Sequence, residues 1–250
     1  MRFSCPRFAS FSALVLATAG LALVGCSRIP GRPGPGPEVV RPNEVLDFGT
    51  LYRANCAACH GEDGRNGAAI SLASPVYLAV VGEDTLREIT AKGVPGKLMP
   101  PFAKSAGGML TDQQVNVIAH GVMQQWSRPD LFAGENIPPY RATLPGDVAR
   151  GQQAFGTFCA RCHGIAGEGS AADAKSGAAK VGSIVDGSYL ALISDQGLRS
   201  ITIAGRPDEG MPDWRTDAGQ PLTDQQITDI VAWLASKRAV NPGQPYPTKP

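Results

Sequence analysis

Two five-residue stretches, Cys56-Ala57-Ala58-Cys59-His60 and Cys159-Ala160-Arg161-Cys162-His163, place two cysteines and a histidine at identical spacing. The chain has six cysteines in 250 residues. Cys5 and Cys26 lie near the N-terminus, so the other four all belong to these two stretches. The fold is therefore expected to form around them.

The spacing of the two stretches has a chemical cause. Two thiols three residues apart on a helical turn can each add to one vinyl group of the same porphyrin, and the adjacent histidine then brings an imidazole nitrogen to the iron. C-x-x-C-H is the pattern of c-type haem attachment. A thioredoxin-like redox pair or half of a zinc site also contains C-x-x-C, but neither accounts for a histidine at the same offset twice. The sequence predicts two covalent haem c groups, attached through Cys56, Cys59, Cys159 and Cys162, with His60 and His163 as iron ligands.

The segments that follow the two haem motifs repeat one another. Tyr77 and Met99 recur as Tyr189 and Met211, in both cases 112 residues later. The haem cysteines recur after only 103 residues, so the second copy contains nine more residues, which fall within 164–183. The pattern indicates a duplication in which the second copy carries an inserted surface loop.

Each copy is predicted to consist of a short helix into the haem motif, a glycine-rich loop, a middle helix, a methionine loop and a final helix. The middle helices are expected at 77–92 and 188–204. The final helices begin with Thr-x-x-Gln at Thr111 and Thr223, a capping-box pattern, and continue with apolar residues at helical spacing. The 30 glycines and 21 prolines predict short helices and long connections. The fold class is therefore all-α, with two small helical domains in tandem around one haem each.

The N-terminal residues are predicted to direct export. Residues 1–25 contain Arg2 and Arg7 before an apolar stretch at 11–24 that is too short to span a bilayer comfortably. Leu-Val-Gly then precedes Cys26, which resembles a bacterial lipobox whose cysteine becomes acylated. An ordinary signal peptide with a free cysteine is the alternative. We expect a lipoprotein anchored through Cys26 on the extracytoplasmic, periplasmic side of a membrane.

The remaining boundaries follow from composition and from the repeat. A Pro/Gly-rich tether is expected at 26–45 and an interdomain linker with four prolines at 128–146. The two helical domains are expected at 46–127 and 147–238, with a tail at 239–250. No later run of about 18 apolar residues occurs, so lipid is the only membrane attachment that the sequence offers.

The second axial ligand of each iron separates an electron carrier from a catalyst. Met99 and Met211 are equivalent in the repeat, and each precedes a proline in a loop. Both could instead be core methionines, but neither Met109 nor Met123 has a counterpart in the second copy. Met99 and Met211 are therefore predicted to ligate the two irons.

Three further polar residues have positions in the repeat that bear on these sites. His120 is the only histidine outside the motifs, and its repeat partner is Ala232, so we expect a surface or interdomain position for it. Arg87 and Arg199 are equivalent in the repeat. For these arginines two interpretations stay open, namely pairing with haem propionates and a solvated helix face.

Taken together, these features resemble class I cytochromes c in tandem. In that family a glycine eight residues before the first haem cysteine, and an aromatic residue four before it, pack against the final helix. Gly151 and Phe155 match this arrangement in the second copy, and Tyr52 matches the aromatic residue in the first. Phe48, however, stands where the glycine is expected.

The final helices suggest how the first copy compensates. The second copy has Trp233 where the family places an aromatic residue, whereas the first copy has Gly121. We hypothesise that the large and the small residue have changed helices in the first copy, so that Phe48 on the first helix faces Gly121 on the last. The proline whose carbonyl orients the haem histidine in many members is also missing. Pro75 is a distant candidate in the first copy, and the second has none, which leaves the orientation of His163 open.

The resemblance implies a protein that transfers single electrons between extracytoplasmic redox partners, such as respiratory complexes, dehydrogenases or other cytochromes, and that is not itself an enzyme. A haem subunit of a larger respiratory oxidoreductase complex is an alternative. A di-haem peroxidase-like enzyme is disfavoured because both halves keep the methionine. A formal charge of +1 and the lack of a basic stripe disfavour nucleic-acid binding.

Overall fold

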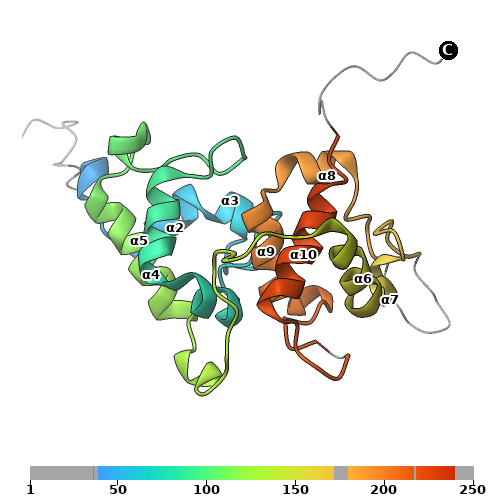
Figure 1. Ribbon diagram of the computed structural model, residues 1–250. Helices are drawn as coiled ribbons and strands as arrows, with labels where there is room; N and C mark the ends of the chain where they lie inside the picture. Colours follow the sequence, from blue (N-terminus) through green and yellow to red (C-terminus); the bar gives the residue numbers. More distant parts are fainter. Residues whose placement is uncertain (1–35, 37–38, 172–179, 217, 240–250) are drawn as a thin grey trace, which may run out of the picture. The chain divides into compact units, whose positions relative to one another are not determined.

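The computed structural model describes residues 36, 39–171, 180–216 and 218–239. Both copies of the repeat lie in the unit Asn43–Pro250, and Met1–Pro42 forms a separate unit. Within the described residues all regular elements are helices, accompanied by three isolated bridges and no strand (Figure 1). The predicted all-α class is confirmed.

The helices of the first copy follow the predicted order. They are the 3-10 turn η2 (Pro42–Glu44), α2 (Phe48–Asn55), α3 (Ala57–His60), α4 (Pro75–Lys92), the 3-10 turn η3 (Lys104–Ala106) and α5 (Asp112–Trp126).

The 3-10 turn η4 (Pro129–Phe132) lies in the predicted linker, and the second copy follows it. Its helices are α6 (Val148–Phe158), α7 (Ala160–His163), α8 (Gly187–Leu192), α9 (Asp195–Ala204), the 3-10 turn η5 (Pro207–Glu209) and α10 (Asp224–Ala235).

The middle helix is broken in both copies, which differs from the continuous helices that the sequence predicts. In α4 the backbone of Gly82 has φ 67° and ψ 161°, a conformation that costs glycine little and interrupts the helix. In the second copy α8 ends before Ser194, whose side chain accepts a hydrogen bond from Gly197 N at 3.0 Å and starts α9. The prediction of continuous helices did not take account of Gly82 or of the run Ser-Asp-Gln-Gly at 194–197.

The two final helices form as predicted. Thr111 with Gln114 in α5, and Thr223 with Gln226 in α10, complete the reciprocal hydrogen bonds of a capping box. The apolar residues at helical spacing are buried in both helices: Val115, Ile118 and Val122 in α5, and Ile227, Ile230 and Leu234 in α10.

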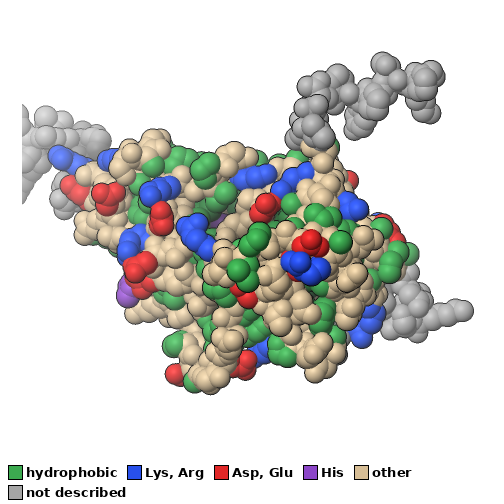
Figure 2. Space-filling model, viewed as in Figure 1, with side chains coloured by type: hydrophobic (Ala, Val, Ile, Leu, Met, Phe, Trp, Pro, Cys, Tyr) green, Lys and Arg blue, Asp and Glu red, His purple; other side chains and the backbone are tan. Residues whose placement is uncertain are grey.

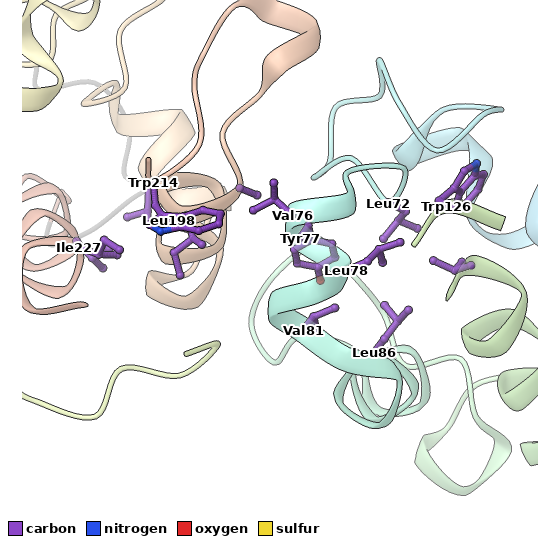
Figure 3. Close-up of a cluster of buried hydrophobic side chains, with 14 of the residues drawn as sticks. Leu72, Val76, Tyr77, Leu78, Val81, Leu86, Trp126, Leu198, Trp214 and Ile227 are labelled. Carbon is purple, nitrogen blue, oxygen red and sulfur yellow. The ribbon is translucent and has the colours of Figure 1, made fainter. Parts of the chain in front are cut away.

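Each copy buries its core between its first, middle and final helices. In the second copy α6 and α9 pack against α10, and Figure 1 shows α6 in olive beside α10 in red. In the first copy α2 and α4 pack against α5. Figure 3 shows Leu198, Trp214 and Ile227 gathered together in the second copy, and Leu72, Leu78 and Trp126 among the core residues of the first. On the face in view in Figure 2, acidic and basic side chains are interspersed.

The insertion of the second copy is closed at its base by the bridge between Ser170 and Val181, whose backbone groups exchange hydrogen bonds of 2.9 and 3.1 Å. Residues 172–179 lie outside the described part of the chain.

Candidate haem sites

Both haem motifs adopt the same tight helical turn. Cys56 and Cys159 interrupt the helix with φ −119° and −120°, and each backbone N–H donates to the carbonyl four residues earlier at 2.8 Å. The backbone N–H groups of His60 and His163 then donate to the carbonyls of Cys56 and Cys159 at 3.0 Å. The two thiols and the imidazole of each motif are thereby held on one turn, as covalent haem attachment requires.

The first thiol in each motif is largely buried, unlike the reactive thiol of a thioredoxin-like pair. Burial, with a smaller contribution from the neighbouring cysteine, raises the pKa of Cys56 to about 11 and that of Cys159 to about 12. Thioredoxin-like pairs depend on a lowered pKa and zinc ligands on thiolates. Among the described residues no group of three His, Cys, Asp or Glu side chains is placed to hold a metal ion.

The imidazole of His60 has a fixed orientation. Its Nδ1 lies 2.8 Å from the carbonyl oxygen of Ile70, so the ring donates through Nδ1 and leaves Nε2 for a metal. Burial lowers the pKa of His60, which keeps the ring in the neutral form that ligates iron. The orienting carbonyl therefore belongs to Ile70, not to Pro75, which the sequence offered and which instead begins α4.

His163 differs from its counterpart. Burial likewise lowers the pKa of His163, but its buried Nδ1 has no hydrogen-bond partner within the described residues. The donor set of two thiols and a neutral imidazole fits a c-type haem in both copies, and the support behind the imidazole is present only in the first.

The methionine loops have the same backbone in both copies. Val94 N donates to Met99 O, and Arg206 N donates to Met211 O, each at 3.0 Å. Both methionine side chains are half-buried. The two loops therefore place Met99 and Met211 in equivalent positions, as the repeat predicts.

A glycine with positive φ precedes each methionine loop, Gly93 with φ 67° and Gly205 with φ 65°. A Cβ on Gly93 would lie 2.7 Å from Met99 O, and one on Gly205 would lie 2.6 Å from Met211 O. Only glycine allows the loop to return this close to the end of the middle helix.

The hypothesis of an exchanged large and small residue is confirmed at the crossing of the first and last helices. A Cβ on Gly121 would lie 2.2 Å from the ring of Phe48, so this ring fills the space beside the glycine. In the second copy a Cβ on Gly151 would lie 1.9 Å from Asp229 O and 2.9 Å from Trp233 Cβ. The glycine is thus on the last helix in one copy and on the first helix in the other.

The exchange also moves a tryptophan, which sequence reasoning missed. Trp233 stacks on Phe155 with ring centroids 4.4 Å apart, whereas in the first copy Trp126 packs against Tyr52 at 5.2 Å. Trp126 lies five residues beyond Gly121, the position equivalent to Trp233. Its ring nevertheless reaches the haem-motif loop, because a Cβ on Gly64 would lie 3.0 Å from it.

The two equivalent arginines have different environments. Arg87 is exposed and pairs with Asp84 at 2.5 Å, which supports the solvated helix face. Arg199 is buried and donates to the Pro139 carbonyl at 2.8 Å and to Thr228 Oγ1 at 3.0 Å. It also pairs with Asp224. Arg199 therefore ties the linker to α10, a role that neither interpretation from the sequence included.

His120 lies on the surface, as the sequence predicts. Its side chain is exposed, and Nδ1 lies 3.3 Å from Glu83 Oε1. His120 belongs to α5, whereas the haem motifs belong to α3 and α7.

The predicted leader and the predicted lipid anchor at Cys26 lie outside the described residues. Among the residues that the structure does describe, no helix combines the length and apolar character needed to cross a membrane.

Comparison with known families matches each copy separately. Residues 43–122 match the family described as cytochrome c oxidase, cbb3-type, subunit III, and residues 148–237 match the family described as cytochrome c.

Two curated relatives match longer stretches of the chain. The cbb3-type cytochrome c oxidase subunit CcoP of Azospirillum sp. (strain B510) is 26% identical over 151 residues, covering 54% of this chain and 46% of the relative. The subunit FixP of Sinorhizobium medicae (strain WSM419) is 28% identical over 188 residues, covering 70% and 56%. The chain thus spans about half the length of the curated relatives that it matches.

A solved structure, a chain of a reducing HAO-like protein complex of Kuenenia stuttgartiensis, matches with a TM-score of 0.45 and 18% identity, over 80% of this chain and 100% of that one. The family matches, together with the duplicated motif turns and methionine loops, identify the two halves. The chain is a tandem of two cytochrome c domains, which implies two haem c groups.

Proposed function

We propose that this chain is a membrane-tethered di-haem cytochrome that passes single electrons between extracytoplasmic redox partners. The observation that carries the proposal is the strict duplication of the site. Both copies keep the cysteine and histidine turn, the glycine before the methionine loop, and the backbone hydrogen bond to the methionine carbonyl. Neither copy is visibly altered toward catalysis.

The proposal assigns a role to each predicted site residue. Cys56 and Cys59 hold the first haem, and Cys159 and Cys162 hold the second. His60 with Met99, and His163 with Met211, would ligate the two irons. The iron supplies a one-electron couple, and a neutral thioether opposite histidine raises its reduction potential.

The protein's own contribution is to keep these ligands in place. Helical turns and glycine-dependent loops fix the side chains on a rigid backbone, so little rearrangement accompanies a change of oxidation state. Two occupied axial positions leave no open site for a substrate, which suits a carrier rather than an enzyme.

The names of the relatives favour a place in a larger assembly. CcoP and FixP are subunits of cbb3-type cytochrome c oxidases by description. We therefore extend the proposal to a chain that delivers electrons as the haem subunit of a respiratory oxidoreductase complex, held at the membrane by acylated Cys26.

The first experiment is an absorption spectrum of the purified holo-protein, oxidised and reduced, with a haem count per chain. Two low-spin haems with the weak charge-transfer band of a methionine–iron bond, and no spectral change with carbon monoxide or peroxide, are expected. A high-spin haem that binds carbon monoxide would contradict methionine ligation and favour the peroxidase-like alternative.

The tether is tested separately. Metabolic labelling with a fatty acid should label the wild-type protein and leave the Cys26→Ser variant unlabelled, and the variant should move from the membrane to the soluble fraction. Membrane association that survives the substitution would overturn lipid anchoring. Affinity purification of the tagged holo-protein from membranes should retain further respiratory subunits if the chain works within a complex.

A further inference from the structure

The hydrogen bond behind His60 is built into a firmly held loop. Ala69 N donates to Cys59 O at 2.9 Å, immediately before Ile70 presents its carbonyl to His60 Nδ1. On the other side of Ile70, Ser71 Oγ donates to Gly64 O at 2.9 Å. The acceptor for the imidazole is thus fixed from both neighbours in the chain.

The loop that follows the second motif has a different set of backbone hydrogen bonds. Gly169 N donates to His163 O at 2.7 Å, and the next carbonyl in the chain, that of Ser170, accepts from Val181 N at 3.1 Å. That bond closes the insertion. His163 Nδ1 is buried and has no hydrogen-bond partner among the described residues. The insertion therefore begins and ends beside the histidine whose Nδ1 has no described acceptor.

This difference has a predictable effect on an iron bound through Nε2. Donation from Nδ1 to a carbonyl increases the electron density of the ring and makes Nε2 a more basic ligand. A more basic ligand stabilises the oxidised iron, so the reduction potential falls. Among the described residues no acceptor faces His163 Nδ1, so the potential of the second site is not lowered in this way.

The charges beside the two motif turns partly cancel. Glu62 and Asp63 follow the first motif, where the second copy has Ile165 and Ala166, and Arg161 replaces Ala58 within the second motif. In the opposite sense, Glu168 of the second copy stands where the first has Arg65, and its carboxylate accepts from Ala166 N at 2.8 Å. These side chains are exposed, so solvent screens their effect, and the buried hydrogen bond carries the argument.

We propose that the first domain holds the haem of lower reduction potential and the second domain the haem of higher potential, so that electrons pass within the chain from the first domain to the second. This inference rests on the proposed function, because it requires two His/Met-ligated haems. It makes the partner of the first domain the electron donor and the partner of the second domain the acceptor.

The test is a spectroelectrochemical titration of the complete holo-protein. We expect two one-electron waves whose redox equilibrium constants differ about tenfold, equivalent to about 59 mV. The variants Met99→His and Met211→His assign the waves, because imidazole in place of the thioether lowers the potential of the altered site only. The wave lowered by Met211→His should be the higher of the two in the wild-type protein. Coincident waves, or the opposite order, would overturn the proposal.

The hydrogen bond itself is tested by a matched pair of variants. Ser71 acts as a positioning residue for the Ile70 carbonyl, and Ser183, its repeat counterpart, donates to Gly167 O at 3.3 Å in a loop with no imidazole partner. Ser71→Ala should raise the reduction potential of the first site. The redox equilibrium constant of that site should change by roughly twofold to fivefold in favour of the reduced form. Ser183→Ala should leave the second potential unchanged, and equal shifts in both would refute this cause.

The failures of the two proposals are distinguishable. A haem count below two, or loss of the methionine–iron band in the wild-type spectrum, would defeat the proposed function before any potential is read. Two intact His/Met sites with reversed potentials would defeat only the direction of electron flow. A ¹⁵N-histidine NMR spectrum of the reduced protein adds an independent reading, in which the Nδ1–H of His60 and not that of His163 shows a hydrogen-bonded shift.

Discussion

The two copies solve the same packing problem with opposite residues. In the second copy Gly151 of α6 lets the backbone of α10 approach closely, and Trp233 covers the crossing. In the first copy Gly121 is on the last helix, and Phe48 comes from the first. Each copy therefore pairs one large side chain with one glycine at the crossing, and either helix can supply the large side chain.

The comparison also shows that relocated residues can keep a contact. Trp126 starts from the end of α5 rather than from the position of Trp233, and both rings lie close to equivalent glycines, Gly64 and Gly167. A residue-by-residue alignment of the copies therefore underestimates their similarity in packing. The copies differ more sharply where a neighbouring segment intervenes, as the linker does at Arg199.

The largest difference in the free energy of unfolding is expected between substitutions of the two equivalent arginines. Arg199→Met would leave Asp224 and the linker carbonyls without their buried cation, which should lower the free energy of unfolding by about 3–5 kcal/mol. Arg87→Met removes an exposed pair and should cost less than about 1 kcal/mol. Urea denaturation of the holo-protein followed by circular dichroism measures both, and equal costs would refute the buried anchor.

The next effect concerns the two crossing glycines. A Cβ at Gly151 meets the backbone oxygen of Asp229, which cannot move aside, so Gly151→Ala should destabilise by about 3 kcal/mol. Alanine gains about 1 kcal/mol in helix propensity at either position, but at Gly121 the obstacle is the Phe48 side chain, which can shift, so Gly121→Ala should cost about 1 kcal/mol. Thermal unfolding of both variants ranks them, and a milder effect at Gly151 would contradict the geometry.

The exchange of large and small residues predicts coupling between two substitutions. Gly121→Trp alone overlaps the Phe48 ring, and Phe48→Gly alone leaves a cavity. Combined, they recreate the arrangement of the second copy. The double variant should be more stable than the sum of the single effects by about 1–2 kcal/mol. Additive costs in a double-mutant cycle would show that the two positions do not compensate one another.

The smallest effect is expected from acid. Burial opposes ionisation of Asp229, but hydrogen bonds from Arg150, from Asp147 N and from Gln225 outweigh it and lower its pKa. A lowered pKa contributes stability that is present above the unfolded value of about 4 and is lost as pH falls through the folded value. The first copy has Val117 at this position.

The measurement is thermal unfolding as a function of pH. Asp229→Asn should flatten the loss of stability below about pH 4. Asp47→Asn is the control, because Asp47 is an exposed helix cap whose pKa is lowered by the Thr50 hydroxyl and backbone. A larger change in the control would argue against the buried carboxylate as the source of acid sensitivity.

Much of the candidate site was predictable because its signals are local. The cysteines and the histidine of each motif are close in sequence, so one helical turn brings them together. The capping boxes at Thr111 and Thr223 likewise depend on residues three apart. The methionine loops were found through the repeat, which compares two copies and needs no knowledge of packing.

Other parts of the site could not be read in this way. The acceptor for His60 is a backbone carbonyl, and every residue carries one, so no side-chain pattern identifies Ile70. The break in the middle helix at Ser194 follows from its capping hydrogen bond from Gly197 N, which the prediction of one continuous helix did not include. The burial of Arg199 depends on where the linker runs, which the identity of the residue does not determine.

By itself the amino-acid sequence determined that this protein is a duplicated, helical chain with two haem motifs and two equivalent methionines, because covalent attachment and helix capping act over a few neighbouring residues. Only the tertiary structure decided which arginine is buried, which residue supplies the carbonyl behind His60, and that no described residue supplies one behind His163. These outcomes depend on backbone groups and segments that meet across the fold, and their positions follow from packing rather than from the spacing of residues in the chain.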